Sequence, residues 1–261
     1  MIKYNPKLWF KHIFQFHKSD TLQILWKELI LVAILTTALT YIELTYFAKH
    51  KVFKDLVSVY SLVGFVLSLL LVFRTNTAYD RWWEGRKKWG ELINNSRNLS
   101  IKINTIVTNQ EARAFFERMI PNFAFSFKEH LRDNKNLELL NLSAEEKREL
   151  AQLNHHPNYI INSFYQQFNK LKLEGKITQE EFLSFDINLK TFSDILGACE
   201  RIKNTPIPYS YSLFLKKFIF IYVSTLPLGF IVNFGYYTAM IAVFIFYVLV
   251  SIEVLAEEIE D

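Results

Sequence analysis

Cysteine, glycine and proline are scarce in this sequence. Cys199 is the only cysteine, which excludes an internal disulfide and any Cys-x-x-Cys metal or redox site. The 7 glycines and 6 prolines stand against 24 phenylalanines and 13 tyrosines, so long helices are favoured over strands and turns. No segment shows convincing strand alternation, an internal repeat or low complexity. The composition therefore predicts an all-α fold.

The sequence also lacks the signature motifs of several function classes. The sequence has no glycine-rich nucleotide loop, no nucleophile elbow and no His-Glu-x-x-His pattern. A net charge of +4 is too small to argue for nucleic acid as a partner. The N-terminus has neither the apolar region nor the small-residue cleavage site of a signal peptide, so insertion without cleavage is expected. We predict neither an enzyme nor a bound cofactor.

What the sequence has is long uncharged stretches, which predict four membrane-spanning helices. Leu56–Phe73 is 18 residues without a charge, close to the roughly 20 that a span needs. The 35 uncharged residues from Phe218 to Ile252 suit two short spans. Leu29–Ile42 is the weakest span, and Glu43 at its end is expected to reach interfacial water. The turn of the final hairpin is expected at Pro227, Gly229, Asn233 and Gly235.

Basic residues orient these spans. They gather before the first span and after the second, whereas only three lysines separate these two spans and the final hairpin turn has none. Because cytoplasmic flanks carry the excess of Lys and Arg, both termini and the long middle segment are predicted to be cytoplasmic. The basic residues are Lys3, Lys7, Lys11, Lys18 and Lys27 before the first span, and Arg74, Arg81, Arg86, Lys87, Lys88 and Arg97 after the second.

The spans divide the chain into five expected parts. A large helical domain lies between two membrane segments. Two of its helices begin with capping pairs, Ser143 with Glu146 and Thr178 with Glu181, and the second of these helices follows a turn at Gly175. The parts are a cytosolic N-terminal segment 1–25, spans one and two 26–73, the helical cytosolic domain 74–212, spans three and four 213–254, and an acidic C-terminus 255–261.

Few residues of the middle domain suggest chemistry. Adjacent histidines such as His155 and His156 can bind a metal, but a solvated loop is the interpretation that we favour, and no metal site is predicted. Cys199 falls on an apolar helical face and is expected to pack in the core. Glu200 and Arg201 are expected to form a structural ion pair at the membrane edge.

One face of the second span has a distinct order of side chains. Ser61, Phe65, Leu69 and Phe73 recur every four residues and therefore share one side of a helix. Contact with lipid or another helix would explain this face equally well. A hydroxyl, an apolar girdle and then small polar residues would also suit a pore wall, which requires several copies around an axis. The polar residues that follow are Asn76, Thr77 and Asp80.

Two long motifs identify the sequence as resembling the bestrophin family, specifically its bacterial branch. They are "FRTNTAYDRWWEGRKKWGELINNSRNL" (Phe73–Leu99) and "GACERIKNTPIPYSY" (Gly197–Tyr211). Their order, their separation by a helical region and the four-span layout all match this family. The motif residues expected to serve structure are Arg81, Trp82, Trp83, Glu200, Arg201, Pro206 and Pro208.

The resemblance implies a homopentameric ion channel in the bacterial plasma membrane. Five copies of the second span would line one axial pore, with a hydrophobic neck at Phe65, Leu69 and Phe73. A cytosolic constriction would lie within Glu180–Ile187, where Leu183 is the expected residue. Animal members carry a calcium-binding acidic cluster after the last span, but the sequence ends before that cluster would begin, so no calcium site is assigned.

The identity of the transported ion follows less directly from the sequence than the architecture does. Apolar neck residues carry no charge, although aromatic edges are electropositive and compatible with anions. Small monovalent anions such as chloride are the expected permeants, and the alternative is a sodium or potassium channel of the same architecture. A membrane-anchored enzyme and a non-conducting scaffold or regulatory subunit are more distant alternatives.

Overall fold

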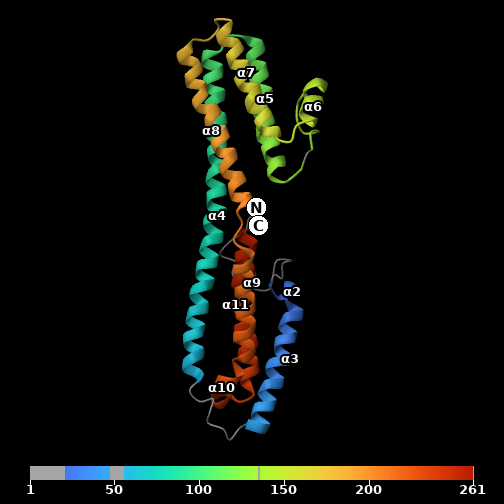
Figure 1. Ribbon diagram of the computed structural model, residues 1–261, viewed down its shortest axis with the longest axis vertical. Coiled ribbons are helices and arrows are strands. Elements are labelled where there is room, and N and C mark those ends of the chain that lie inside the picture. Colours follow the sequence, from blue (N-terminus) through green and yellow to red (C-terminus); the bar gives the residue numbers. More distant parts are fainter. Residues whose placement is uncertain (1–20, 48–55, 135, 261) are drawn as a thin grey trace, which may run out of the picture. The chain divides into compact units, whose positions relative to one another are not determined.

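A computed structural model describes residues 21–47, 56–134 and 136–260 and shows only helices in these ranges. The predicted N-terminal segment up to residue 20 and the lysines between the first two spans lie outside them. The helices are α2 (Thr21–Ile24), α3 (Trp26–Ile42), the π-helix η2 (Glu43–Phe47), α4 (Leu56–Ile106), α5 (Gln110–Leu131), α6 (Ala144–Ala151), α7 (His156–Leu173), α8 (Gln179–Asn204), α9 (Tyr209–Thr225), α10 (Pro227–Phe234) and α11 (Tyr237–Glu260) (Figure 1).

The chain forms two compact units. The first contains the residues up to Asp80 together with Ile207–Asp261, and the second contains Arg81–Pro206. Helix α4 contributes to both, because it continues without interruption through Asp80. Within the described residues, four helical stretches are long and apolar enough to cross a membrane. They are Trp26–Tyr46, Leu56–Ile106, Gln179–Phe234 and Tyr237–Glu260.

In the first unit, α11 packs against α3, α9 and α10, and Figure 1 shows α3 running beside α11. The shared core is apolar and includes residues from α4, so the four apolar segments bury one stripe each and leave the rest of their surface exposed. The buried members are Val32, Leu67, Leu71, Leu215, Ile219, Val223, Leu226, Ala242 and Phe246.

The predicted hairpin turn is present in the long apolar stretch. Helix α9 ends at Thr225, α10 starts at Pro227, and the chain reverses at Gly235, whose φ of 53° favours glycine. Proline at the start of α10 costs no hydrogen bond, because the first helical N–H groups have no partner within the helix.

Glu43 differs from expectation. It begins the π-helix that continues α3, and its side chain is only 5 % exposed, so the prediction that it reaches water was wrong. The wider π-helical turn carries it into the first unit, because α10 packs against both α3 and the π-helix.

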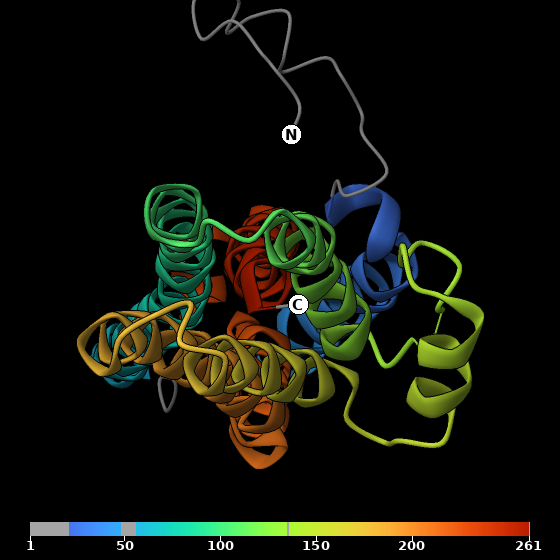
Figure 2. The ribbon, with the colours of Figure 1, turned by 90° about the horizontal axis from the view of Figure 1, so that it is seen from above.

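Phenylalanine dominates the core of the second unit. Helices α5, α7 and α8 pack against one another, while α6 lies on the side of α5 away from α4 and α8 (Figures 1 and 2). Ring centroids of Phe116 and Phe168 lie 4.4 Å apart, and those of Phe168 and Phe185 lie 4.3 Å apart. Such pairs add to the burial energy of each ring. Cys199 is buried in the same core, as predicted.

Local signals set the helix starts of this unit. Both predicted capping boxes are present, at Ser143 with Glu146 and at Thr178 with Glu181, and Gly175 adopts a positive φ of 69°. The solvated loop predicted for His155 and His156 was wrong. His155 is the N-cap of α7, and His156 begins that helix in a buried position.

Candidate functional site: the exposed face of helix α4

The face of α4 singled out in the sequence is uncovered in the chain. Phe65, Leu69 and Phe73 are 62 %, 42 % and 63 % exposed. At about 1.5 Å per residue they extend over roughly 12 Å of one helix side. The opposite side of α4 is buried, with Leu67 and Leu71 in the core of the first unit. The three predicted neck residues therefore share an accessible apolar surface.

Close packing on the buried side fixes the rotation of α4 within the first unit. The hydroxyl of Tyr60 donates to the carbonyl of Thr225 at 2.6 Å. A Cβ on Gly64 would lie 2.6 Å from the hydroxyl oxygen of Tyr222, so glycine is what permits this approach to α9. The hydroxyl of Tyr211 donates to the carbonyl of Leu70 at 3.0 Å. These contacts hold the face with Phe65 outward.

Polar residues flank the apolar face on the same side. Ser61, Asn76, Thr77 and Asp80 are all exposed. The hydroxyls of Ser61 and Thr77 donate to the carbonyls four residues earlier, at 2.9 and 2.8 Å. Because the α-helix satisfies these hydroxyls internally, each remains an acceptor for water. The observed order along α4 is polar, apolar, polar.

A buried ion pair anchors α4 beyond this face. Arg74 is 2 % exposed, and its guanidinium lies 2.6 Å from a carboxylate oxygen of Glu260, the last residue of α11. The other oxygen of Glu260 accepts from the backbone N–H of Ile207 at 2.8 Å. We interpreted Arg74 from the sequence only as a cytoplasmic flank. Its buried partner is 186 residues further along the sequence, and so distant a contact leaves no local sequence signal.

Arg81 of the first motif holds the end of α8, which belongs to the second motif, within the second unit. Arg81 donates to the carbonyls of Thr205 and, at 2.9 Å, Ile202, and so satisfies the free carbonyls of that helix end. The rings of Trp82 and Trp83 stack with centroids 6.0 Å apart. Pro206 follows the end of α8, and Pro208 is the N-cap of α9 in the first unit. Leu183, the residue expected at the cytosolic constriction, lies on α8 and is 53 % exposed. Ile187, one helical turn further along α8, is 65 % exposed.

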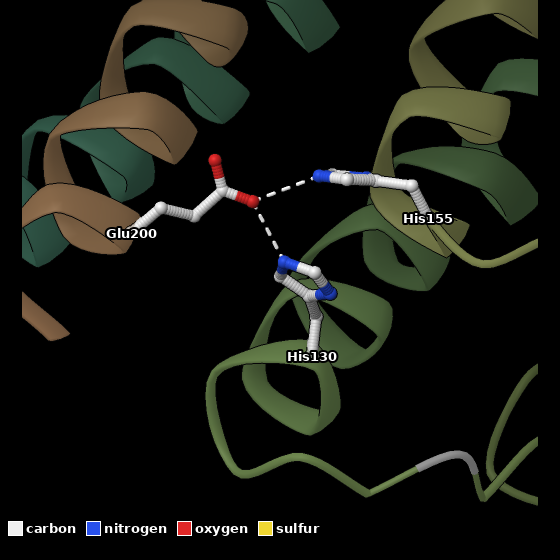
Figure 3. A group of neighbouring side chains, drawn as sticks. All are labelled: His130, His155 and Glu200. Carbon is white, nitrogen blue, oxygen red and sulfur yellow. Dashed lines mark hydrogen bonds and ion pairs between the residues drawn. The ribbon is translucent and has the colours of Figure 1, made fainter. Parts of the chain in front are cut away.

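The predicted ion pair between Glu200 and Arg201 was wrong. Arg201 instead pairs with Glu84 on α4, and Glu200 pairs with His130 and His155 (Figure 3). Successive residues point to different sides of a helix, so they cannot share one partner surface. Burial disfavours ionisation of Glu200, but the hydrogen bonds from both histidines outweigh it, and its pKa is lowered.

Fold and site together define a helical membrane protein in which α4 carries an accessible apolar face. The bacterial and fungal bestrophin family model matches residues 1–261, and the chain belongs to this family. A voltage-dependent anion channel-forming protein of Nostoc sp. is 34 % identical over 267 residues, covering 98 % of this chain and 84 % of that protein. The protein of the same name from Escherichia coli strain K12 is 30 % identical, with 97 % and 83 % covered.

Solved structures agree with this assignment. A bacterial bestrophin homologue from Klebsiella pneumoniae has a TM-score of 0.81 and 26 % identity, covering 89 % of this chain and 87 % of that one. Both motifs that suggested the family were therefore sound indicators of it.

Proposed function

We propose that this chain forms an anion channel, in which copies of α4 surround a pore and Phe65, Leu69 and Phe73 form its hydrophobic neck. The observation that carries the proposal is the exposed α4 face itself, in a family whose relatives bear the name of anion channel-forming proteins. Three large apolar side chains on one uncovered helix side must be covered by lipid or by protein, and copies of the same face around an axis would cover them.

The neck acts through dehydration. A constriction lined by phenylalanine and leucine offers no hydrogen bonds to water, so a narrow state excludes water and blocks ions of either sign. When the neck widens, the electropositive edges of Phe65 and Phe73 face the passing ion. Anions are favoured by this field, whereas cations meet the ring faces only if the rings rotate. Asp80 and the other polar residues keep the wider part of the pore wet.

The assembly is the first thing to test. One α4 cannot enclose a pore, and five copies are proposed. The purified full chain in detergent is expected to have about five times the 30.9 kDa chain mass, after the bound detergent is subtracted by light scattering. A stable monomer would overturn the proposal that several chains enclose a pore.

A measurement of ionic current tests whether the channel passes anions or cations. The protein in a planar bilayer under a KCl gradient is expected to give a reversal potential near that of chloride. A reversal near that of potassium supports the cation alternative, and no current under any condition favours a scaffold.

The neck has its own variant. Replacing Phe65, Leu69 and Phe73 together with alanine widens the dry constriction and is expected to raise conductance severalfold. Phe244→Ala is the control, because it removes a phenylalanine that is 65 % exposed on α11. Unchanged current in the triple variant, with the oligomer intact, would show that these residues are not the gate.

A further inference from the structure

Three side chains from three helices of the second unit converge on one point. His130 lies in the last turn of α5, His155 is the N-cap of α7, and Glu200 lies on α8. Figure 3 shows both imidazoles directed at the carboxylate. The Nε2 atoms of His130 and His155 lie 2.7 and 2.8 Å from the same oxygen, Oε1 of Glu200. One ligand atom from each residue falls within 4.8 Å of the other two.

This donor set has a definite metal preference. Two imidazoles and one carboxylate are a recurrent ligand set for zinc, which completes its four-coordinate shell with water. Calcium takes six to eight oxygen ligands and magnesium demands an octahedral oxygen shell, so a single carboxylate suits neither. We propose that His130, His155 and Glu200 form a binding site for one divalent ion of the zinc type.

The site is open enough for an ion to enter. The side chains of His130, His155 and Glu200 are 27 %, 34 % and 29 % exposed, so water reaches each of them. Lys203, the nearby cation whose ammonium donates to the carbonyl of His130 at 3.4 Å, is neutralised by its ion pair with Asp133. The remaining acidic charge therefore favours a cation at Glu200.

Binding requires a small rearrangement. Zinc holds nitrogen and oxygen ligands at about 2.0–2.1 Å, which separates two ligands of a tetrahedral ion by roughly 3.4 Å. The present contacts of 2.7 and 2.8 Å are direct hydrogen bonds, so the Glu200 carboxylate must withdraw by less than about 1 Å. Rotation about its flexible side chain supplies this movement without a shift of α8.

The start of α7 is coupled to the ion. The backbone N–H of Asn158 donates to Nδ1 of His155 at 3.3 Å, which places the ring proton on Nε2. An ion on Nε2 moves that proton to Nδ1, so this long capping bond is lost. In return the ion joins α5, α7 and α8 directly. Because only the folded chain brings these three residues together, bound zinc stabilises the second unit.

Calorimetry on the full chain tests the site. The protein in detergent is freed of metal with a chelator, dialysed and titrated with ZnCl2, with CaCl2 as the comparison. One zinc ion per chain is expected, with no calcium heat at the same concentration, and zinc is expected to raise the thermal midpoint. Absence of zinc binding by the native chain would overturn the proposal.

Three single variants locate the ion. His130→Gln, His155→Gln and Glu200→Gln are each expected to weaken zinc binding at least about tenfold, since even outer partners of metal ligands cost that much. Glutamine at either histidine position keeps an N–H that can donate to Glu200, which limits the loss of stability. The controls are His156→Gln, next to the site, and Glu145→Gln, on the exposed surface of α6.

Folding is followed separately from binding. If a variant has a lower thermal midpoint without metal, the shift of that midpoint upon zinc addition is measured instead, and this shift is expected to disappear. Zinc affinity unchanged in all three variants would place the ion elsewhere, for example on histidines outside the described residues, and would refute the site.

Discussion

Arg74 and Glu260 form an ion pair in which the guanidinium side chain is 1 % exposed and the carboxylate side chain 11 %. The pair joins the helix that carries the proposed neck to the last turn of α11. A buried charge needs its partner, because the energy of removing both from water is recovered only through their mutual attraction. An interior position of α4 and the end of α11 are thus linked electrostatically within the first unit.

Removing one charge of this pair should destabilise the protein strongly. Glu260→Gln keeps an acceptor for Ile207 but removes the ion-pair partner of the buried Arg74, at a cost of about 3–5 kcal/mol. We expect a clear fall in the thermal midpoint in detergent. Adding Arg74→Met should recover most of the loss, since methionine removes the buried charge and keeps a long side chain in its place. The control is Glu258→Gln in the same helix, and an equal shift in both single variants would contradict the prediction.

Acid should weaken the link between α5 and α6. Hydrogen bonds from the Arg118 guanidinium outweigh burial and lower the pKa of Glu146 from 4.5 to about 2. The lowered pKa adds stability that is complete above pH 4.5 and is lost as the pH falls towards 2. The contribution is about 1–2 kcal/mol after allowance for water screening. Arg118→Met should therefore cost this amount at pH 7 and less than half of it at pH 3.

Unfolding curves at the two pH values provide the measurement. Arg148→Met, at an exposed position of α6, is the matched control and should show no such pH dependence. A difference between Arg118→Met and the native chain that is the same at both pH values would argue against the carboxylate of Glu146 as the cause.

A methyl group at Gly64 should force α4 and α9 apart. Its Cβ would meet the Tyr222 hydroxyl oxygen at 2.6 Å, so Gly64→Ala is expected to cost about 1–3 kcal/mol despite its better helix propensity. Tyr222→Phe removes that oxygen and should restore much of the stability of the double variant. By contrast, Gly90→Ala, with no atom within 4 Å of its Cβ, should stabilise the helix by about 0.5–1 kcal/mol. Thermal midpoints that rank Gly64→Ala above Gly90→Ala would disprove the close contact.

Structural features that depend on residues close together in the sequence were predictable. The capping boxes at Ser143 and Thr178 and the turn at Gly175 depend on contacts within a few residues, so sequence spacing was enough. The long apolar segments were equally clear, because composition decides them. The four-residue period placed Phe65, Leu69 and Phe73 on one side of α4, and their role as a pore neck stays a prediction.

Features that depend on tertiary packing were not predictable. His130 and His155 reach Glu200 across 70 and 45 residues of sequence, and no pattern in one sequence reports that convergence. The predicted ion pair between Glu200 and Arg201 was wrong because adjacent residues of a helix project in different directions. Glu43 was misplaced because the π-helix, which turns it inward, has no distinct sequence signal.

The burial of Cys199 has a practical consequence. Its side chain is 7 % exposed, and burial raises the pKa of the thiol, so the reactive thiolate is scarce and sheltered. Because Cys199 is the only cysteine, the unsubstituted chain should react very slowly with thiol reagents. A single cysteine introduced at Phe65, Leu69 or Phe73 would be the dominant target of a water-soluble alkylating reagent. The rate of its modification would then record, position by position, when the proposed neck fills with water.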